Sequence, residues 1–272
     1  MELQVVKSNH IINASYRLSV LEQRIILTCM SKVPRHEVIT DQTLYSISAA
    51  ELVEMTGGDI KTAYRDLKVA SKRLFDRSVT LYKEPDGSQR HPSKMLTRWC
   101  QSVNYIDAEG RVELRFGTDI IPYINMLSEQ FTRYALSAVI NMSNSYAIRI
   151  YEHFAQWRGT KQEITITVDE LKSVLQIEDK YPLFADLKRW VIEKAIQEIN
   201  EATDLKASYT TRKTGRKVSH IIFKFREKPK PKSEKTKTLT KAQAEKLARP
   251  GESYTQLYAR LKAEGYRVRI KT

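Results

Sequence analysis

The sequence predicts an α+β fold in which two helices followed by a β-hairpin occur twice, with a basic extension after the second copy. Three observations lead to this prediction. An amphipathic helix followed by two alternating strands stands in the second half, and the same order of elements occurs in the first half. Residues 228–241 are rich in lysine and proline and have no core-forming pattern. We therefore expect tandem domains and a flexible basic tail.

The second half contains the clearest pattern. Pro182 suits the first turn of a helix that runs to Ala202, because the N–H that proline lacks would be unsatisfied there anyway. Its apolar face recurs at three and four residues, at Phe184, Leu187, Val191, Ala195 and Ile199. Strands at 205–210 and 218–225 flank a predicted basic turn at 211–217. Helix, strand, basic turn and strand is the order of a winged helix, whose recognition helix enters a DNA major groove while the hairpin forms the wing.

The first half shows the same plan. Ser19 and Glu22 predict a capping box for a helix that Pro34 ends. We expect a turn-rich stretch at 83–93 and a helix with a connector at 119–138. The other predicted elements are a strand at 45–47, helices at 48–55 and 60–75, and strands at 78–82, 97–105 and 112–116.

Two short matches indicate a duplication. Residues 47–52, Ile-Ser-Ala-Ala-Glu-Leu, align with residues 166–171, Ile-Thr-Val-Asp-Glu-Leu, at an offset of 119, and Asp-Leu-Lys at 66–68 aligns with Asp-Leu-Lys at 186–188 at an offset of 120. In the second half a helix at 145–157, a strand at 164–168 and a helix at 169–175 precede the long helix. The predicted organisation is an N-terminal arm at 1–17 (a polar lead-in), winged-helix domains at 18–137 and 138–227, and a basic linker and tail at 228–272. Within the tail we expect a short helix at 253–263, a stop at Gly265 and an extended segment at 266–270.

The charge favours a polyanionic partner. The net charge is +14, and residues 228–272 hold 13 Lys or Arg against 4 Glu, which leaves +5 for residues 1–227. If residues 1–227 bind DNA, they must therefore do so through local basic surfaces. An excess of basic over acidic residues of this size occurs in ribosomal, RNA-binding and DNA-binding proteins alike.

Both predicted recognition helices carry candidate DNA contacts. In the first, four cations lie on one face, opposite the apolar face, and Arg can pair bidentately with guanine. In the second, the cations of the first two turns point away from the apolar stripe, and the turn adds four more that suit phosphates. The alternative for these surfaces is a solvated basic face. For Trp190, packing in a core or interface is favoured over base contact. The candidate residues are Lys61, Arg65, Lys68, Lys72, Lys188, Arg189, Arg212, Lys213, Arg216 and Lys217.

Nothing in the sequence indicates catalysis. There is no Gly-x-x-x-x-Gly-Lys-Ser/Thr phosphate loop, and the five histidines (His10, His36, His91, His153 and His220) are scattered. Cys29 and Cys100 are isolated, which indicates neither a disulfide framework nor a cysteine-based zinc site and favours a reducing cytoplasmic location. We expect no metal and no cofactor. Tyr151 lies on an apolar helix face, where core packing is favoured over a nucleophilic role. No membrane-spanning run or signal peptide is expected, and the protein is predicted to be a binding protein rather than an enzyme.

Fragments in the order of the chain resemble the iteron-binding plasmid replication initiators, the family of the RepE and Pi-type Rep proteins. The resemblance covers about residues 5–226. The fragments are Tyr16-Arg17-Leu18-Ser19 through Arg24; Pro122-Tyr123-Ile124 with Leu127, Phe131-Thr132 and Tyr134; residues 144–152, Asn-Ser-Tyr-Ala-Ile-Arg-Ile-Tyr-Glu; Glu198-Ile199-Asn200 with Thr203; and Gly215-Arg216-Lys217 through Phe225.

The resemblance implies an initiator whose monomers bind directly repeated origin sequences with both winged helices. It also implies origin opening with the host initiator ATPase, loading of the replicative helicase, and dimers that associate through the first domain, repress the initiator's own gene at an inverted repeat and are converted to monomers by chaperones. In the family's second recognition helix, Lys188 and Arg189 match basic positions, whereas Trp190 stands where the F-plasmid relative has a further arginine. Arg65 and Lys68 fall in the corresponding first helix. The location implied is the bacterial cytoplasm, at plasmid or nucleoid DNA.

Two rival interpretations use the same residues. A transcriptional regulator with two winged helices would make the same DNA contacts without initiating replication. A DNA-processing enzyme such as a tyrosine recombinase would instead form a covalent adduct with nicked DNA.

Overall fold

The computed structural model describes residues 2–34, 37–83, 88, 94–125, 130–229, 237–263 and 266–269. The chain separates into two units, residues 1–227 and residues 228–272, which are described one at a time. Several predicted features lie outside the described residues: most of the turn-rich stretch at 83–93, His36, His91, Leu127, linker residues 230–236, Gly265 and Ile270.

The N-terminal residues belong to the core, so the prediction of a polar lead-in at 1–17 is wrong. β1 (Gln4–Ser8) pairs antiparallel with β7 (Phe131–Ala135), and α1 (Asn9–Ile12) follows β1. Val5, Ile11 and Ile12 are fully buried. A strand of five residues gives too short an alternation to be recognised among the polar residues around it.

The first repeat follows the predicted order. α2 (Val20–Ser31) begins at the predicted capping box, in which the Glu22 amide donates to Ser19 Oγ (3.3 Å) and the Ser19 amide donates to Glu22 Oε2 (2.7 Å). It ends at Ser31, before Pro34. The remaining elements are β2 (Tyr45–Ser48), α3 (Ala49–Thr56), α4 (Ile60–Phe75), β5 (Cys100–Ile106), the short turn η1 (Asp107–Glu109) and β6 (Arg111–Phe116), and the strand order is β2-β6-β5.

One strand prediction in this repeat is wrong. Residues 97–105 divide between β4 (Met95–Arg98), which pairs with β3 (Ser78–Leu81), and β5 in the other sheet. Trp99 joins the two sheets: its amide donates to the Arg77 carbonyl (3.2 Å), and its carbonyl accepts from the Gly117 amide (3.0 Å). After β6, the expected helix at 119–138 is reduced to α5 (Ile121–Ile124), followed by β7 and η2 (Leu136–Ala138).

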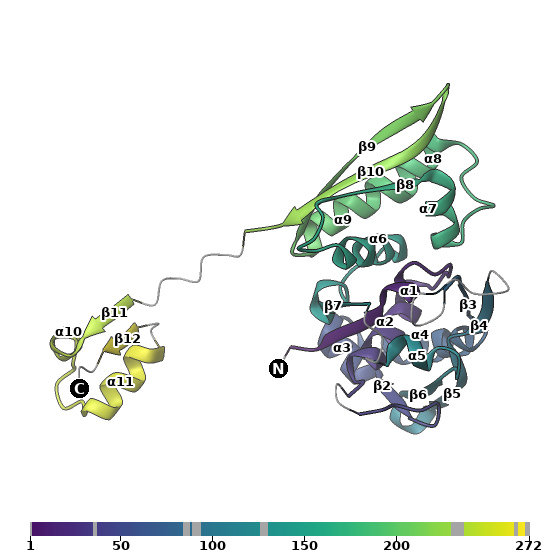
Figure 1. The fold of residues 1–272 in the computed structure, drawn as a ribbon. Helices are drawn as coiled ribbons and strands as arrows, with labels where there is room; N and C mark the ends of the chain where they lie inside the picture. Colours follow the sequence, from purple (N-terminus) through teal and green to yellow (C-terminus); the bar gives the residue numbers. More distant parts are fainter. Residues whose placement is uncertain are drawn as a thin grey trace. The chain divides into compact units, whose positions relative to one another are not determined.

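The second repeat has the same topology. α6 (Ser145–Gln156), β8 (Glu163–Thr167) and α7 (Val168–Leu175) precede a helix made of α8 (Phe184–Leu187), η3 (Lys188–Glu193) and α9 (Lys194–Ala202). β9 (Leu205–Thr214) and β10 (Lys217–Glu227) complete a sheet of order β8-β10-β9. In both repeats the first strand pairs with the last, as the predicted duplication requires (Figure 1). Pro182 is not in the helix, which begins at Phe184 with Leu183 as its N-cap, so that detail of the prediction is wrong.

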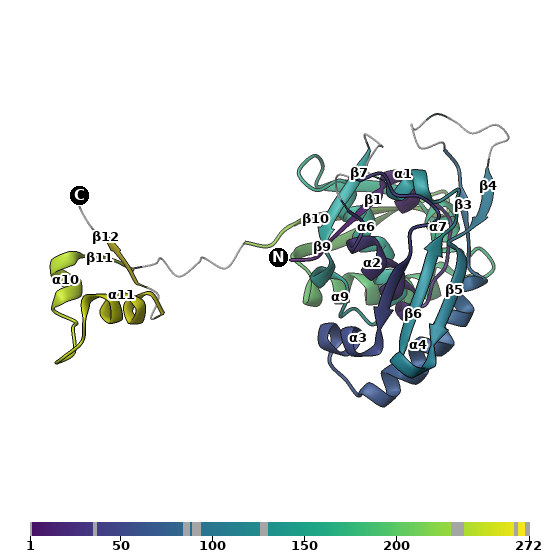
Figure 2. The same ribbon diagram turned by 90° about the horizontal axis from the view of Figure 1, so that it is seen from below.

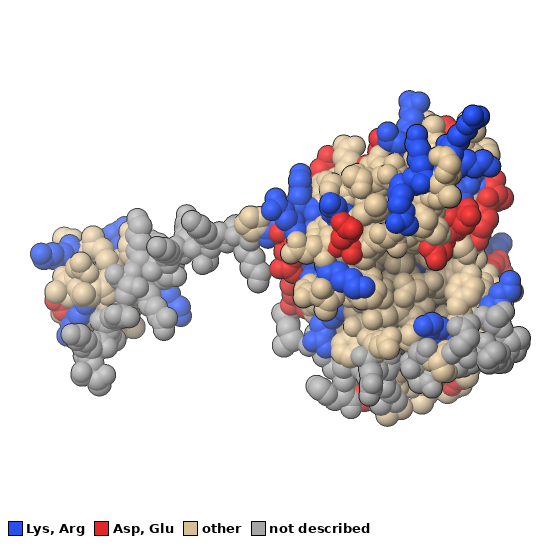
Figure 3. Space-filling model, turned by 45° about the horizontal axis from the view of Figure 1, so that its top comes forward, with Lys and Arg blue, Asp and Glu red and all other residues tan. Residues whose placement is uncertain are grey.

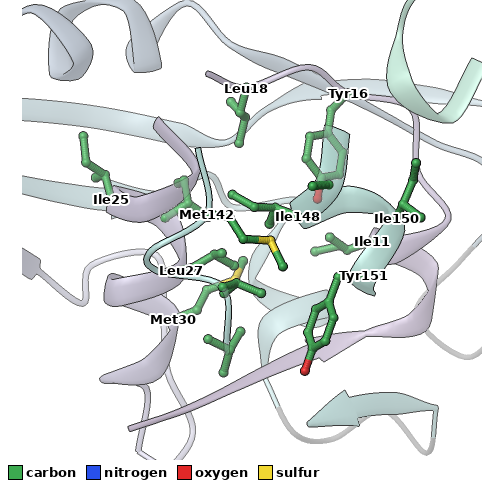
Figure 4. Packing of buried hydrophobic residues seen from close by; sticks show 14 of the residues in the cluster. Ile11, Tyr16, Leu18, Ile25, Leu27, Met30, Met142, Ile148, Ile150 and Tyr151 are labelled. Carbon is green, nitrogen blue, oxygen red and sulfur yellow. The ribbon is translucent and has the colours of Figure 1, made fainter. Parts of the chain in front are cut away.

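A single hydrophobic core joins the two repeats. α6 contacts β7 and α1 on one side and α9 on the other (Figures 1 and 2). Figure 4 shows Ile148 of α6 among Tyr16 and Leu27 of the first repeat and Met142 of the connector. Because α6 is buried on both sides, it holds the two helix-and-hairpin assemblies in one unit.

The second unit contains a small fold of its own. β11 (Lys237–Thr240) pairs in parallel with β12 (Tyr266–Arg269), and α10 (Lys241–Glu245) and α11 (Tyr254–Ala263) lie between them in the chain. Ala244, Leu257 and Leu261 form its core. The predicted helix at 253–263 and the extended segment after it are confirmed for the described residues, but the predicted linker is wrong from residue 237 onwards.

Candidate nucleic-acid interface

The recognition helix of the second repeat contains a π-helical segment. α8, η3 and α9 follow one another without a break, and residues 188–193 have the wider π turn. Leu187 and Val191 are fully buried, and Lys188, Arg189 and Trp190 between them are exposed. Single π turns inside α-helices are rare and frequent at functional sites. This one presents three adjacent side chains to solvent.

Trp190 lies among cations on this surface. Its side chain is 44% exposed, so the alternative that it packs in the core of this chain is wrong. The Arg189 guanidinium carbon lies 4.9 Å and the Lys194 ammonium 5.1 Å from the centre of its ring. Lys188 pairs with Glu193 at 3.5 Å, with both side chains half exposed. The helix therefore offers an aromatic face and a guanidinium at one place.

The hairpin of β9 and β10 forms the predicted wing. Its two-residue turn is Gly215-Arg216, with φ of 61° at Gly215, the conformation that glycine adopts at the first central position of a type II′ turn. The basic turn predicted at 211–217 is therefore shorter, and Arg212 and Lys213 belong to β9. β8 pairs with β10 only over residues 220–224, so the hairpin continues as two strands beyond the sheet. Arg212, Lys213, Arg216 and Lys217 are all exposed there, and Figure 3 shows Lys and Arg side chains gathered over the second repeat.

A cleft separates the wing from the start of the recognition helix. It has a volume of about 900 Å³ and is lined by Lys213, Arg216 and Lys217 on one side and by Leu183 and Phe184 on the other. Lys172 Nζ donates to the carbonyls of Lys180 (2.8 Å) and Tyr181 (2.9 Å), which fixes the loop before α8. Asp169 also lines the cleft, so its charge is mixed, with cations in excess.

The cations of α4 are less free than the sequence indicated. Lys61, Arg65, Lys68 and Lys72 are exposed on the helix. However, Arg65 Nε pairs with Asp66 (2.9 Å), and Lys68 Nζ pairs with Asp107 at the β5–β6 turn (2.5 Å). The hydrogen bond to Asp107 raises the pKa of Lys68. Because carboxylates of the same repeat accompany two of the four cations, the row by itself does not require an external anion.

A buried ionic network behind these surfaces was not predicted. Glu152 of α6 accepts from Lys7 Nζ (2.6 Å) and from the Tyr134 hydroxyl (2.5 Å), and its other oxygen lies 3.2 Å from Arg149 Nη1. All four side chains are almost completely buried. Burial alone would raise the pKa of Glu152, but Lys7 and Arg149 outweigh it and the pKa is lowered.

Arg149 connects the network to both repeats. Its Nη2 donates to the carbonyls of Ile12 (3.1 Å), Ala14 (2.8 Å) and, in α7 of the second repeat, Val174 (3.4 Å). The guanidinium also stacks 3.6 Å from the ring centre of Tyr16. Tyr16, Arg149 and Glu152 lie in the fragments that carry the family resemblance. Because charged side chains are usually exposed, no pattern in the sequence assigned Arg149 and Glu152 to the core.

Comparison with known proteins identifies the chain. The family description "Initiator Replication protein, WH1" matches residues 4–155, and "Initiator Rep protein, WH2" matches residues 167–225. The chain belongs to the initiator replication protein family. Its α+β fold therefore contains two winged-helix domains, as predicted. The predicted boundary at residues 137 and 138 lies inside the first match, and the limits of the domains stay a prediction.

Individual relatives agree with this assignment. An Escherichia coli "Replication initiation protein" is 29% identical over 229 residues, covering 82% of this chain and 69% of the relative. The Escherichia coli "PI protein" is 29% identical over 232 residues, covering 75% and 76%. A crystal structure of Pi initiator protein in complex with iteron DNA has a similar fold, with a TM-score of 0.66 at 24% identity, covering 84% of this chain and 99% of that one.

No helix within the described part of this initiator has the length and apolar character needed to cross a membrane.

Proposed function

We propose that this initiator binds double-stranded DNA at directly repeated sites of a plasmid origin, through a recognition helix in each repeat. The observation that carries the proposal is the arrangement in the second repeat, where the helix that exposes Arg189 and Trp190 begins on one side of a cleft and the basic wing lies on the other. A recognition helix in the major groove with a wing on the phosphates is the geometry of this class of DNA-binding domain.

The candidate residues divide by their expected role. Arg189 and Trp190 are proposed to read bases, because they stand on the exposed π turn. Lys188 and the wing residues Arg212, Lys213, Arg216 and Lys217 are proposed to bind phosphates. On α4, Lys61 and Lys72 form no ion pair within 4.0 Å among the described residues, so they are proposed as phosphate contacts, together with Arg65 and Lys68 after these exchange their carboxylate partners for DNA.

Several features of the family are extended to this chain as proposals. Monomers would open the origin with the host initiator ATPase and load the replicative helicase. Dimers formed through the first domain would repress the initiator's own gene at an inverted repeat, and chaperones would shift dimers to monomers. The location proposed is the bacterial cytoplasm, on plasmid DNA.

The initiator is proposed to act without a catalytic tyrosine. The Tyr151 side chain is fully buried, where its hydroxyl donates to Asp204 Oδ1 (3.2 Å) and accepts from Arg158 (3.2 Å). Burial raises the pKa of Tyr151 strongly. A buried phenol that resists ionisation is a poor nucleophile, which supports a binding role.

The test is binding of the full chain to duplex DNA that carries the direct repeats next to its own gene, compared with scrambled duplex, across a salt series. We expect discrimination of roughly 10³ or more at physiological salt, the lower end for specific DNA-binding proteins. Equal affinity for both duplexes, with a steep salt dependence, would mean that the initiator binds phosphates only and would overturn the proposal.

A further inference from the structure

The second unit carries most of the positive charge of the initiator. Residues 228–272 hold 13 Lys or Arg and 4 Glu, a net charge of +9 out of +14 in a sixth of the chain. The two family matches end before this unit, at residues 155 and 225. The two winged-helix domains therefore leave its charge and its fold without a role.

Residues 237–269, called here the C-terminal module, are held together by apolar packing, a capping box and one ion pair. The core is made by Ala244, Leu257 and Leu261. Thr240 and Gln243 form a capping box at the start of α10. Arg260 forms a two-bonded ion pair with Glu252, at 2.8 Å for each oxygen.

The described acidic groups of the module are both engaged within it. Glu252 is held by Arg260, and Glu245 accepts a hydrogen bond from the Tyr254 hydroxyl (3.0 Å). The pKa of Glu252 is lowered to about 2, first by its hydrogen bonds with the Arg260 side chain, so it stays ionised and paired. Four exposed cations remain that form no ion pair within 4.0 Å in the described part of the chain: Lys241, Lys246, Arg249 and Lys262.

An exposed aromatic ring stands beside one of these cations. The Lys241 ammonium lies 5.7 Å from the ring centre of Tyr254, which is 57% exposed. Unpaired cations gathered on one small unit form the electrostatic footprint of a nucleic-acid contact, made through the phosphates.

We propose that the C-terminal module is a separate, sequence-independent contact to duplex DNA, made with the phosphates of DNA beside the site that the winged helices bind. Residues 230–236 connect the units, and seven residues span at most about 25 Å. Once the first unit is on DNA, the module meets phosphates at the high effective concentration of a tethered group. The module lengthens the footprint and raises affinity without changing sequence preference.

The experiment measures binding of the full chain to a 40-base-pair duplex of random sequence across a salt series. The test variant carries Lys241→Gln, Lys246→Gln, Arg249→Gln and Lys262→Gln. Each phosphate contact contributes about 0.9 to the slope of log affinity against log salt concentration, so four lost contacts reduce the slope by about 3 to 4. We also expect affinity at physiological salt to fall at least tenfold.

Two control variants separate a local contact from the effect of charge alone. The first removes four exposed cations of the first unit away from the recognition helices and the wing tip, by Lys161→Gln, Lys206→Gln, Lys224→Gln and Arg226→Gln. It has the same net charge as the test variant and is expected to keep the wild-type slope. The second keeps the charge of the module, by Lys241→Arg, Lys246→Arg and Lys262→Arg, and is also expected to keep it. The circular dichroism of the test variant should match that of wild type.

The proposal is overturned if the test variant keeps the wild-type slope, or if the first control lowers the slope as much as the test variant does. The inference needs a DNA-binding first unit but not a sequence-specific one. The probe is a duplex of random sequence. If the initiator failed to recognise the directly repeated DNA sites, the proposed function would be wrong but this test would stay valid.

Discussion

The recognition helices of the two repeats differ by one residue, and that residue accounts for their different surfaces. In α4 two residues, Lys68 and Val69, separate the buried Leu67 from the buried Ala70. In the second repeat three residues, Lys188, Arg189 and Trp190, separate the buried Leu187 from the buried Val191. Beyond this point the buried positions run in parallel, with Ser71 and Leu74 in one helix and Ile192 and Ala195 in the other.

The π turn absorbs the extra residue. An additional residue in an α-helix would rotate the following apolar positions by about 100° and expose them, because one turn takes 3.6 residues. A single π turn restores the register and bulges the extra residue outward. Lys68 of α4 and the aligned Lys188 are both paired with a carboxylate, whereas the second repeat alone gains an exposed Arg-Trp pair at this turn. This difference supports the proposal that the second helix reads bases and the first mainly binds phosphates.

The buried network around Glu152 joins the two repeats, and breaking it has the largest expected effect. Glu152→Gln leaves Lys7 and Arg149 buried beside a neutral group. Removing one partner of a buried ion pair costs about 3 to 5 kcal/mol of the free energy of unfolding. Urea unfolding measures this, with Glu163→Gln as control, since that carboxylate pairs with an exposed lysine at 3.5 Å and its loss costs at most about 1 kcal/mol. Equal destabilisation by both substitutions would contradict a joint made by the buried network.

The same joint should be sensitive to acid through His153. Burial first, and then the Arg149 charge, lower the pKa of His153 to about 3 from 6.5. Below pH 6.5 the unfolded chain therefore binds a proton that the folded chain excludes. The contribution of the neutral His153 side chain to the free energy of unfolding is fully present above pH 6.5. It falls by about 1.4 kcal/mol per pH unit as the pH decreases toward 3.

His153→Leu should remove this part of the pH dependence. Between pH 6.5 and 4.5 we expect wild type to lose about 2 to 3 kcal/mol more than the variant, measured by urea unfolding at both pH values. Gln156→Leu, a substitution of a neutral side chain in the same helix, is the control and should keep the pH profile of wild type. If the free energy of unfolding of His153→Leu depends on pH as that of wild type does, His153 does not take up a proton when the chain unfolds.

The sequence predicted the repeat but not this joint or the π turn. Apolar spacing located α4 at its observed ends, because its face is continuous from Leu67 to Leu74. In the second helix the spacing of Leu187, Val191 and Ile192 is compatible with either an α or a π turn, so the extra residue left no local signal. Arg149 and Glu152 are buried only because Lys7 and Tyr16 meet them from more than 130 residues away. A charge pattern on one helix cannot show such a partner.

Arg189→Ala sharpens the division of roles between the helices. We expect specific affinity for the repeats to fall by about 1 to 3 kcal/mol and affinity for scrambled duplex to change much less, because a base contact carries sequence information. Fluorescence anisotropy with both duplexes measures this, and Lys194→Ala, on the other side of Trp190, is the matched loss of one cation. If Arg189→Ala weakens both duplexes equally, the residue binds phosphate.

Deletion of Trp190 tests the one-residue difference directly. If the π turn holds an extra residue, the deletion converts η3 to an α-helical turn and keeps Val191 and Ile192 buried. Its free energy of unfolding should then lie within about 1 kcal/mol of that of Trp190→Ala, the scale of a single helix-propensity change. Deletion of Val69 in α4, which has no π turn, is the control and should destabilise strongly. Equal destabilisation by the two deletions would remove the structural basis of the comparison.

Lys68→Gln should have the smallest effect, because Lys68 must exchange Asp107 for a phosphate when DNA binds. We expect affinity to fall only about twofold to fivefold, equally on repeat and scrambled duplex, and the salt slope to decrease by about 1. Asp107→Asn provides the matched change on the other side of the pair: it frees the ammonium and should raise affinity for both duplexes by a similar factor. A loss confined to the repeats in Lys68→Gln would show that α4 reads bases as well, and the two helices would then differ in geometry but not in role.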